Sequence, residues 1–123
     1  KHLRINWTEG EKHFRNCLLD FNKANNVAQW QWVAGCGADA APYFRIFNPI
    51  LQGEKFDKEG IYVKKWVPEL KNVPNKFIHK PWEMELKYQE AIKTIIGKDY
   101  PKPVVVHEVA RKAALTAFQT LKK

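Results

Sequence analysis

Residues 25–45, NNVAQWQWVAGCGADAAPYFR, constrain the fold of this chain more than any other segment. The run over 25–34 favours a helix, and Gly35 can end it because glycine readily adopts the left-handed conformation. At about 3.6 residues per turn, Asn26 and Trp30 lie on one face, and the second tryptophan of the WQW triplet points away from both. The segment therefore predicts an amide beside an indole, followed by a small-residue stretch where backbone can approach a flat ligand.

Helical periodicity recurs along the rest of the chain, and no credible strand ladder interrupts it. Thr8 and Glu11 fit a capping box and predict a helix over 9–21, with a buried stripe of Phe14, Leu18 and Phe21. Further helices are expected over 42–48, from Asp57 through Trp66, over 83–96 with closure at Gly97, and over 107–121. Residues 48–56 are expected to form a loop with a short helical turn. Trp66 and Trp82 are expected to be core aromatics. The predicted class is all-α.

Composition favours a polyanionic partner. The formal net charge is +8, the isoelectric point is about 9.5, and there are five tryptophans. Such a balance is typical of a nucleic-acid-facing surface, with a basic domain lacking that partner as the alternative. Five tryptophans indicate stacking, electron transfer or an aromatic core.

The cysteines and the hydropathy pattern bear on location. Cys17 and Cys36 have no metal-ligand spacing and are too few for a disulfide framework. No run of about 18 apolar residues is present, and the first residues lack the apolar segment of a signal peptide. We therefore expect a reduced, cytoplasmic setting and no membrane partner.

Taken with IFNPILQGEKFDKEG and KKWVPEL, residues 25–45 closely resemble the flavin-binding helical domain of the DNA photolyase and cryptochrome family. The motifs occur in the family order, and the chain aligns with the carboxyl-terminal part of that domain. The resemblance implies one partial domain over residues 1–123, with long loops, and FAD as cofactor. It also implies that an amino-terminal antenna domain with its own chromophore precedes Lys1.

The resemblance assigns cofactor-binding residues around the start of the helix over 25–34. The family pattern D-x-D-x-x-x-N places acids at the flavin edge and ribityl chain and the asparagine beside flavin N5. Asp20 matches the first acid and Asn26 the asparagine, while Asn22 replaces the second acid and loses its negative charge. Phe21 lies between them and belongs to the same set. Without the resemblance, these polar residues would be interpreted as helix caps.

Asn26 also discriminates within the family. A neutral amide can donate to and accept from the ring without a permanent charge. Plant-type cryptochromes tend to carry Asp at this position, and animal-type ones Cys. Asn26 therefore favours repair over signalling.

The tryptophans and Arg45 receive roles in the same way. Trp30 resembles the proximal member of the electron-transfer chain, and Trp7, 13 positions before Asp20, its middle member; the distal member is expected before Lys1. Trp32 matches the residue that packs against a flipped pyrimidine lesion. Arg45 matches the arginine on the DNA-facing side, with a buried ion pair to Asp39 or another acid as the alternative.

The implied activity of the parent protein is light-driven, FAD-dependent cleavage of cyclobutane pyrimidine dimers in damaged DNA, which makes it a carbon–carbon lyase. Two alternatives stay open: a cryptochrome-type blue-light photoreceptor, and a basic helical domain that binds nucleic acid without flavin. The lesion type, cyclobutane or (6-4), and the antenna chromophore are not fixed by these residues. We expect a monomeric parent, and an isolated segment that is inactive and exposes enough former core to self-associate.

Overall fold

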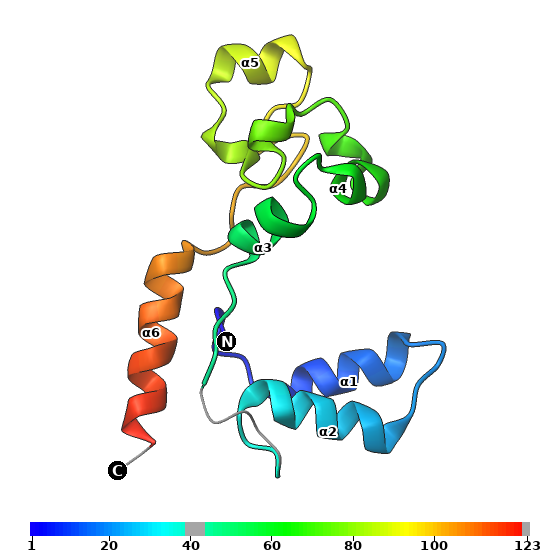
Figure 1. The fold of residues 1–123 in the computed structure, drawn as a ribbon, viewed down its shortest axis with the longest axis vertical. Coiled ribbons are helices and arrows are strands. Elements are labelled where there is room, and N and C mark those ends of the chain that lie inside the picture. The colour runs from blue at the N-terminus through cyan, green and yellow to red at the C-terminus, as the bar shows by residue number, and fades with distance from the viewer. Residues whose placement is uncertain (39–43, 122–123) are drawn as a thin grey trace. The chain divides into compact units, whose positions relative to one another are not determined.

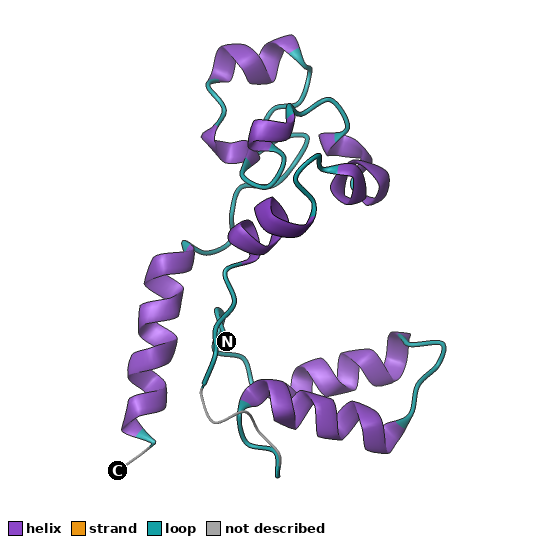
Figure 2. Cartoon of the chain, viewed as in Figure 1, coloured by secondary structure: helices purple, strands orange, loops and turns teal. Residues whose placement is uncertain are grey.

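The computed structural model describes residues 1–38 and 44–121 as a series of short helices (Figures 1 and 2). Within those ranges there is no named strand, and one isolated bridge joins Ile96 and Tyr100. The all-α expectation is therefore confirmed. The chain divides into two compact units: unit 1 comprises residues 1–46 and 105–123, and unit 2 comprises residues 47–104. The single partial domain expected over 1–123 stays a prediction.

Unit 1 contains α1 (Trp7–Cys17), α2 (Lys23–Ala34) and α6 (His107–Thr120). Helices α1 and α2 pack against each other as a helical hairpin (Figure 1). Helix α6 has the bounds expected to within one residue. Helix α2 begins at a cap formed by Asn22, and Gly35 closes it at φ 81°, as expected.

The beginning of α1 differs from the prediction. Asn6 caps the helix, and its Oδ1 accepts from the Thr8 N–H at 3.1 Å, so the capping box is wrong. Glu11 is buried against α2 and cannot reach back to a cap. The predicted stripe is wrong as well: Phe14 and Leu18 are each 41% exposed, and Phe21 is half-buried beyond the helix end.

The helix expected over 42–48 is wrong where the structure describes it, since residues 44–48 are not helical; 42 and 43 lie outside the described residues. Pro49 instead opens α3 (Pro49–Phe56), which replaces the predicted loop. Proline suits the first helical position because its missing N–H would have no partner there. Asn48 supplies the cap by accepting from the N–H groups of Ile50 and Leu51.

Unit 2 continues with α4 (Ile61–Trp66), whose first turn is held by Asp57 as expected. The Asp57 carboxylate accepts from the N–H groups of Tyr62 at 3.1 Å and Val63 at 3.2 Å. Desolvation acts to raise the pKa of Asp57, but these two N–H groups and the nearby His79 outweigh it, so the pKa lies below its usual value.

Three 3₁₀ turns, η1 (Pro68–Leu70), η2 (Asn75–Phe77) and η3 (Pro81–Glu83), precede the short α5 (Leu86–Ala91). The single helix expected over 83–96 is therefore wrong. The helix is interrupted because the Gln89 side chain bonds to backbone on both sides of α5. Its Nε2 donates to the Met84 carbonyl at 2.7 Å, and its Oε1 accepts from the Ile96 N–H at 2.9 Å. These two bonds close the chain into a loop around a buried amide.

The core of unit 2 consists of Leu70, Val73, Ile78 and Met84, each at most 3% exposed. The prediction that Trp66 and Trp82 are core aromatics is wrong, since these residues are 62% and 37% exposed. Within the described ranges, no helix is long and apolar enough to cross a bilayer.

Candidate functional site

The contact between α1 and α2 depends on a glycine. The six-membered part of the Trp30 indole lies directly on Gly10, where a Cβ would overlap it. Phe14, one turn later on α1, meets the same indole edge-on, with ring centroids 5.1 Å apart and an interplanar angle of 78°. Trp30 is thus half-buried against α1, with its orientation set by a close helix approach.

A polar contact lies beside this indole. Asn26 and Glu11 are both buried, at 7% and 5% exposure. The Asn26 Nδ2 donates to the Glu11 backbone carbonyl at 3.0 Å and to its carboxylate Oε1 at 3.2 Å. Asn26 and Trp30 therefore face the same helix, α1, as the spacing of four residues predicts.

These contacts fix the orientation of the Asn26 amide. A backbone carbonyl only accepts hydrogen bonds, so the amide nitrogen must face Glu11 and the amide oxygen must point elsewhere. In the described part of the chain, Oδ1 accepts no hydrogen bond, and no buried side-chain oxygen or nitrogen lacks a partner. Oδ1 is therefore accessible, and it offers an oriented acceptor to a ligand.

Arg15 neutralises the buried carboxylate. Its Nη2 lies 2.9 Å from Glu11 Oε1 and 2.8 Å from Oε2, and its Nε lies 3.3 Å from Oε1. Burial of a carboxylate is costly unless it is paired with an opposite charge and hydrogen-bonded. Arg15 supplies both to Glu11.

Trp7 is the first residue of α1 and is half-buried. It lies three residues before Gly10, and positions three apart on a helix share a face. The face of α1 that carries Trp7 is therefore the one against which Trp30 packs. The structure thus brings the two tryptophans assigned to electron transfer onto one hairpin.

A shallow groove of about 520 Å³ runs along α2, lined by Lys23, Ala24, Val27, Ala28 and Gln31. By helical position, it lies between the face of Asn26 and Trp30 and the face of Trp32. Its two alanines leave backbone accessible to a flat group. Trp32 itself is 46% exposed, as its opposite orientation predicts.

The connection between α1 and α2 holds the other predicted cofactor residues. Asn22 Oδ1 accepts from the Asn25 N–H at 2.9 Å, so this side chain does act as a helix cap. Asp20 is exposed and Phe21 is half-buried. In the described ranges, the Asp20 carboxylate takes part in no ion pair or hydrogen bond, so it is available to a ligand.

Arg45 is exposed, and its backbone carbonyl accepts from the Lys1 ammonium group. The alternative ion pair with Asp39 involves a residue outside the described ranges. In the part of the chain that the structure describes, no hydrogen bond or ion pair joins the Arg45 side chain to the hairpin, although Arg45 belongs to the same unit.

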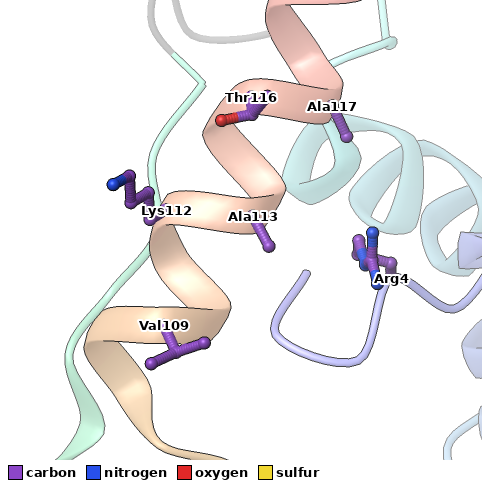
Figure 3. Close-up of a pocket in the computed structure, with 6 residues that line it drawn as sticks. All are labelled: Arg4, Val109, Lys112, Ala113, Thr116 and Ala117. Carbon is purple, nitrogen blue, oxygen red and sulfur yellow. The ribbon is translucent and has the colours of Figure 1, made fainter.

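A second groove lies apart from these residues. It measures about 690 Å³ and is lined by Arg4 and by the α6 residues Val109, Lys112, Ala113, Thr116 and Ala117 (Figure 3). Arg4 has an unusual positive φ of 53°. In the described part of the chain, no cluster of three His, Cys, Asp or Glu side chains is suited to a metal ion.

The sequence analysis did not identify Gly10, Glu11 and Arg15 as site residues. Glu11 was assigned to a helix cap, and Gly10 and Arg15 received no role. One signal was present: Glu and Arg four residues apart form an ion pair on a helix. The burial of that pair against Asn26 depends on the packing of α2 and has no local signature.

Comparisons with known proteins show which family the chain resembles. A family model described as the FAD binding domain of DNA photolyase matches residues 1–120. The deoxyribodipyrimidine photo-lyase of Agrobacterium fabrum is 54% identical over 123 residues, which are 100% of this chain and 26% of that protein. The enzyme of the same name from Escherichia coli K12 is 48% identical over 100% of this chain and 25% of its own length.

Solved structures give the same result. A bacterial class III photolyase from Agrobacterium tumefaciens superposes with a TM-score of 0.92 at 54% identity, covering 99% of this chain and 25% of that one. A cryptochrome from Synechocystis sp. PCC6803 superposes with a TM-score of 0.86 at 38% identity, covering 92% of this chain and 23% of that one. The chain thus spans about a quarter of the length of these relatives.

Proposed function

The chain belongs to the family of the FAD-binding domain of DNA photolyase, and we propose that it forms one wall of the FAD site in a deoxyribodipyrimidine photolyase. The full-length protein would repair cyclobutane pyrimidine dimers in DNA under light. One observation carries this proposal: the buried Asn26 amide, with Nδ2 held by Glu11 and Oδ1 unengaged, lies on the same helix face as Trp30.

The residues present fit a flavin. Oδ1 of Asn26 is an accessible acceptor beside an indole, and the adjoining groove carries Ala24 and Ala28, whose small side chains admit a flat ring. Among the described residues nothing bonds to the Asp20 carboxylate, and Phe21 follows it in the chain. FAD, when bound, supplies light absorption and electron donation, for which protein groups provide orientation and tuning.

Asn26 holds a hydrogen bond at a defined flavin atom in this proposal. Since Nδ2 is engaged by Glu11, the side chain presents only its oxygen to N5. An oxygen acceptor is complementary to a protonated N5 and repels the lone pair of an unprotonated one. The amide thereby favours flavin that carries a proton at N5, which is the state of the reduced ring.

Trp30 and Trp7 would pass electrons toward the cofactor. An indole can give up an electron and be refilled by the next indole, provided that the two rings lie close together. The packing of Trp30 on Gly10, three residues from Trp7, supports this order. Asn22 contributes less to the cofactor site than its position suggests, because its Oδ1 already caps α2.

The proposed contacts with DNA are made by exposed residues. Trp32 is 46% exposed and offers an indole on which a flipped base can stack, which is worth about 1–3 kcal/mol per base. Arg45 is exposed and can form the paired N–H contacts that suit a phosphate. The formal net charge of +8 adds general attraction for DNA.

Two matched tryptophan substitutions in the full-length protein test the proposal. We expect Trp30→Phe to abolish light-driven reduction of bound FAD while DNA affinity is retained. Trp32→Phe, two residues away on the opposite face, should retain photoreduction and weaken the binding of dimer-containing DNA. Equal photoreduction by both variants, or a full-length protein without FAD, would overturn the assignment.

A blue-light photoreceptor is the second candidate function, favoured by the structural similarity to a cryptochrome. Asn26, which favours the reduced ring, supports repair instead. Illumination of the full-length protein with dimer-containing DNA separates the two. Restoration of intact pyrimidines is the result expected for a photolyase, and flavin photoreduction without any repair would identify a photoreceptor.

A further inference from the structure

Three polar side chains form a connected row from the surface of α1 to the buried face of α2. Arg15 has a 50% exposed side chain, the Glu11 side chain is 7% exposed, and Asn26 is buried. We propose that Arg15 is a positioning residue for the cofactor: by holding both Glu11 oxygens, it fixes the Asn26 amide with Oδ1 toward the flavin. This inference rests on the proposed FAD site.

The geometry of the carboxylate is set by Arg15. The terminal torsion of a glutamate is broad, so a carboxylate held at one point can still rotate. Arg15 Nη2 contacts both oxygens, at 2.9 and 2.8 Å, and Nε adds a longer bond to Oε1 at 3.3 Å. The carboxylate plane is therefore fixed, and Oε1 remains 3.2 Å from Asn26 Nδ2.

The arginine fork is specific to this role. A lysine ammonium is a point charge, whereas guanidinium matches the two oxygens of a carboxylate. The spacing of four residues, with the acid first, is the favourable arrangement on a helix. Lysine at position 15 would keep the charge and lose the second fixed contact.

The orientation of Asn26 depends on this arrangement. Its Nδ2 has two acceptors, the Glu11 carbonyl and Oε1. Without a fixed carboxylate, one of the two bonds that hold Nδ2 is lost, so the opposite orientation, with the nitrogen toward the flavin, becomes less unfavourable. An amide nitrogen donates to unprotonated N5, which belongs to the oxidised ring. Loss of Arg15 should therefore reduce the preference for reduced over oxidised FAD.

A simple structural ion pair would behave differently. If Arg15 only stabilised α1, its removal would weaken the binding of oxidised and reduced FAD by the same factor. The ratio of the two dissociation constants separates positioning from stabilisation. Lys12 is the matched control, because it is an exposed cation on the same helix and forms no ion pair or hydrogen bond with the Glu11 carboxylate in the described ranges.

The experiment measures anaerobic binding of oxidised and reduced FAD to the full-length wild type and to three variants. An oriented hydrogen bond contributes about 1 kcal/mol, so Arg15→Met should lower the reduced-over-oxidised affinity ratio about fivefold. Arg15→Lys should restore part of that loss, and Lys12→Met should leave the ratio unchanged.

An unchanged ratio in Arg15→Met, or an equal loss in Lys12→Met, would overturn the positioning role while leaving the proposed function intact. A wild-type protein that binds neither form of FAD would instead overturn the proposed function. Should Arg15→Met fail to fold, an unchanged ratio in Arg15→Lys would overturn the role, because the lysine variant retains the charge.

Discussion

Unit 2 buries Leu70, Val73, Ile78 and Met84 in one apolar cluster, whereas the buried residues in the α1–α2 hairpin of unit 1 are Glu11 and Asn26. The first arrangement is an ordinary small core, whose stability comes from area removed from water. The second gains little from apolar burial and depends on hydrogen bonds and a paired charge.

Exposed aromatic surface is present in both units and does not separate them. In the hairpin, Trp7 and Trp30 are half-buried and Trp32 is 46% exposed, while Trp66 of unit 2 is 62% exposed. The division therefore lies in what each unit buries. An apolar core suits unit 2 as a scaffold, whereas the oriented amide and the paired charge of the hairpin suit contacts with a ligand.

The largest effect is expected in the apolar core. Leu70→Ala should destabilise the chain by about 2–5 kcal/mol, because the cavity adds to the lost burial. Urea unfolding followed by helical circular dichroism measures the change. The control is Leu51→Ala on α3, which is exposed and should stay within about 0.5 kcal/mol of wild type. Comparable losses in the two variants would contradict the scaffold role of this core.

The next effect concerns Gly10. Glycine to alanine on an exposed helix stabilises by roughly 0.5–1 kcal/mol, but here the new Cβ overlaps Trp30, so Gly10→Ala should destabilise by about 1–3 kcal/mol. In a Trp30→Ala background the sign should reverse. A double-mutant cycle by urea unfolding tests both statements, and additive effects would show that the indole does not lie on Gly10.

A smaller effect on stability is expected at two helix caps, one in each unit. Asn22 caps α2 in unit 1, and Asn48 caps α3 in unit 2. Either one replaced by alanine should lose about 1 kcal/mol of unfolding free energy. Asn22→Asp keeps an acceptor and should be nearly neutral. If Asn22→Ala left stability unchanged and reduced only FAD affinity in the full-length protein, its main role would be ligand binding and not capping.

The smallest effect is a pH dependence in unit 1. His2 Nε2 lies 2.8 Å from His107 Nδ1. Desolvation, together with the charge of His107, lowers the pKa of His2 below its usual 6.5. Because the unfolded chain binds the proton more readily, this stabilising effect is present above about pH 6.5 and is lost as the pH falls through the lowered pKa.

An NMR titration of the His2 ring measures this shift, with His107→Phe as the matched variant. The pKa of His2 should move upward toward its usual value in that variant, since the charge of His107 is removed. A His2 titration unaffected by His107→Phe would show that the two rings do not interact.

The parts of the fold that the sequence predicted are those with local causes. Helix α2 was predicted because Gly35 is a strong signal for a helix end and because the polar residues that precede the helix suit a helix start. Helix α6 was predicted from its periodicity alone, and Asp57 was assigned to the correct helix start. In each case the determining residue lies within a few positions of the helix it controls.

The errors have tertiary causes. The break in the helix expected over 83–96 follows from Gln89, which bonds to backbone on both sides of α5. Glu11 was assigned to a cap, because nothing in its neighbourhood reveals that α2 covers it. At the candidate site, the shared face of Asn26 and Trp30 followed from helix spacing, whereas the Glu11–Arg15 pair beneath them required the packed hairpin.

A crystal structure of the full-length protein with FAD tests the central claim most directly. The account predicts that Asn26 keeps Nδ2 on the Glu11 carbonyl and places Oδ1 within hydrogen-bond distance of flavin N5, with Trp30 beside the ring. A flavin bound away from α2, or an Asn26 side chain that gives its nitrogen to the ring, would contradict it.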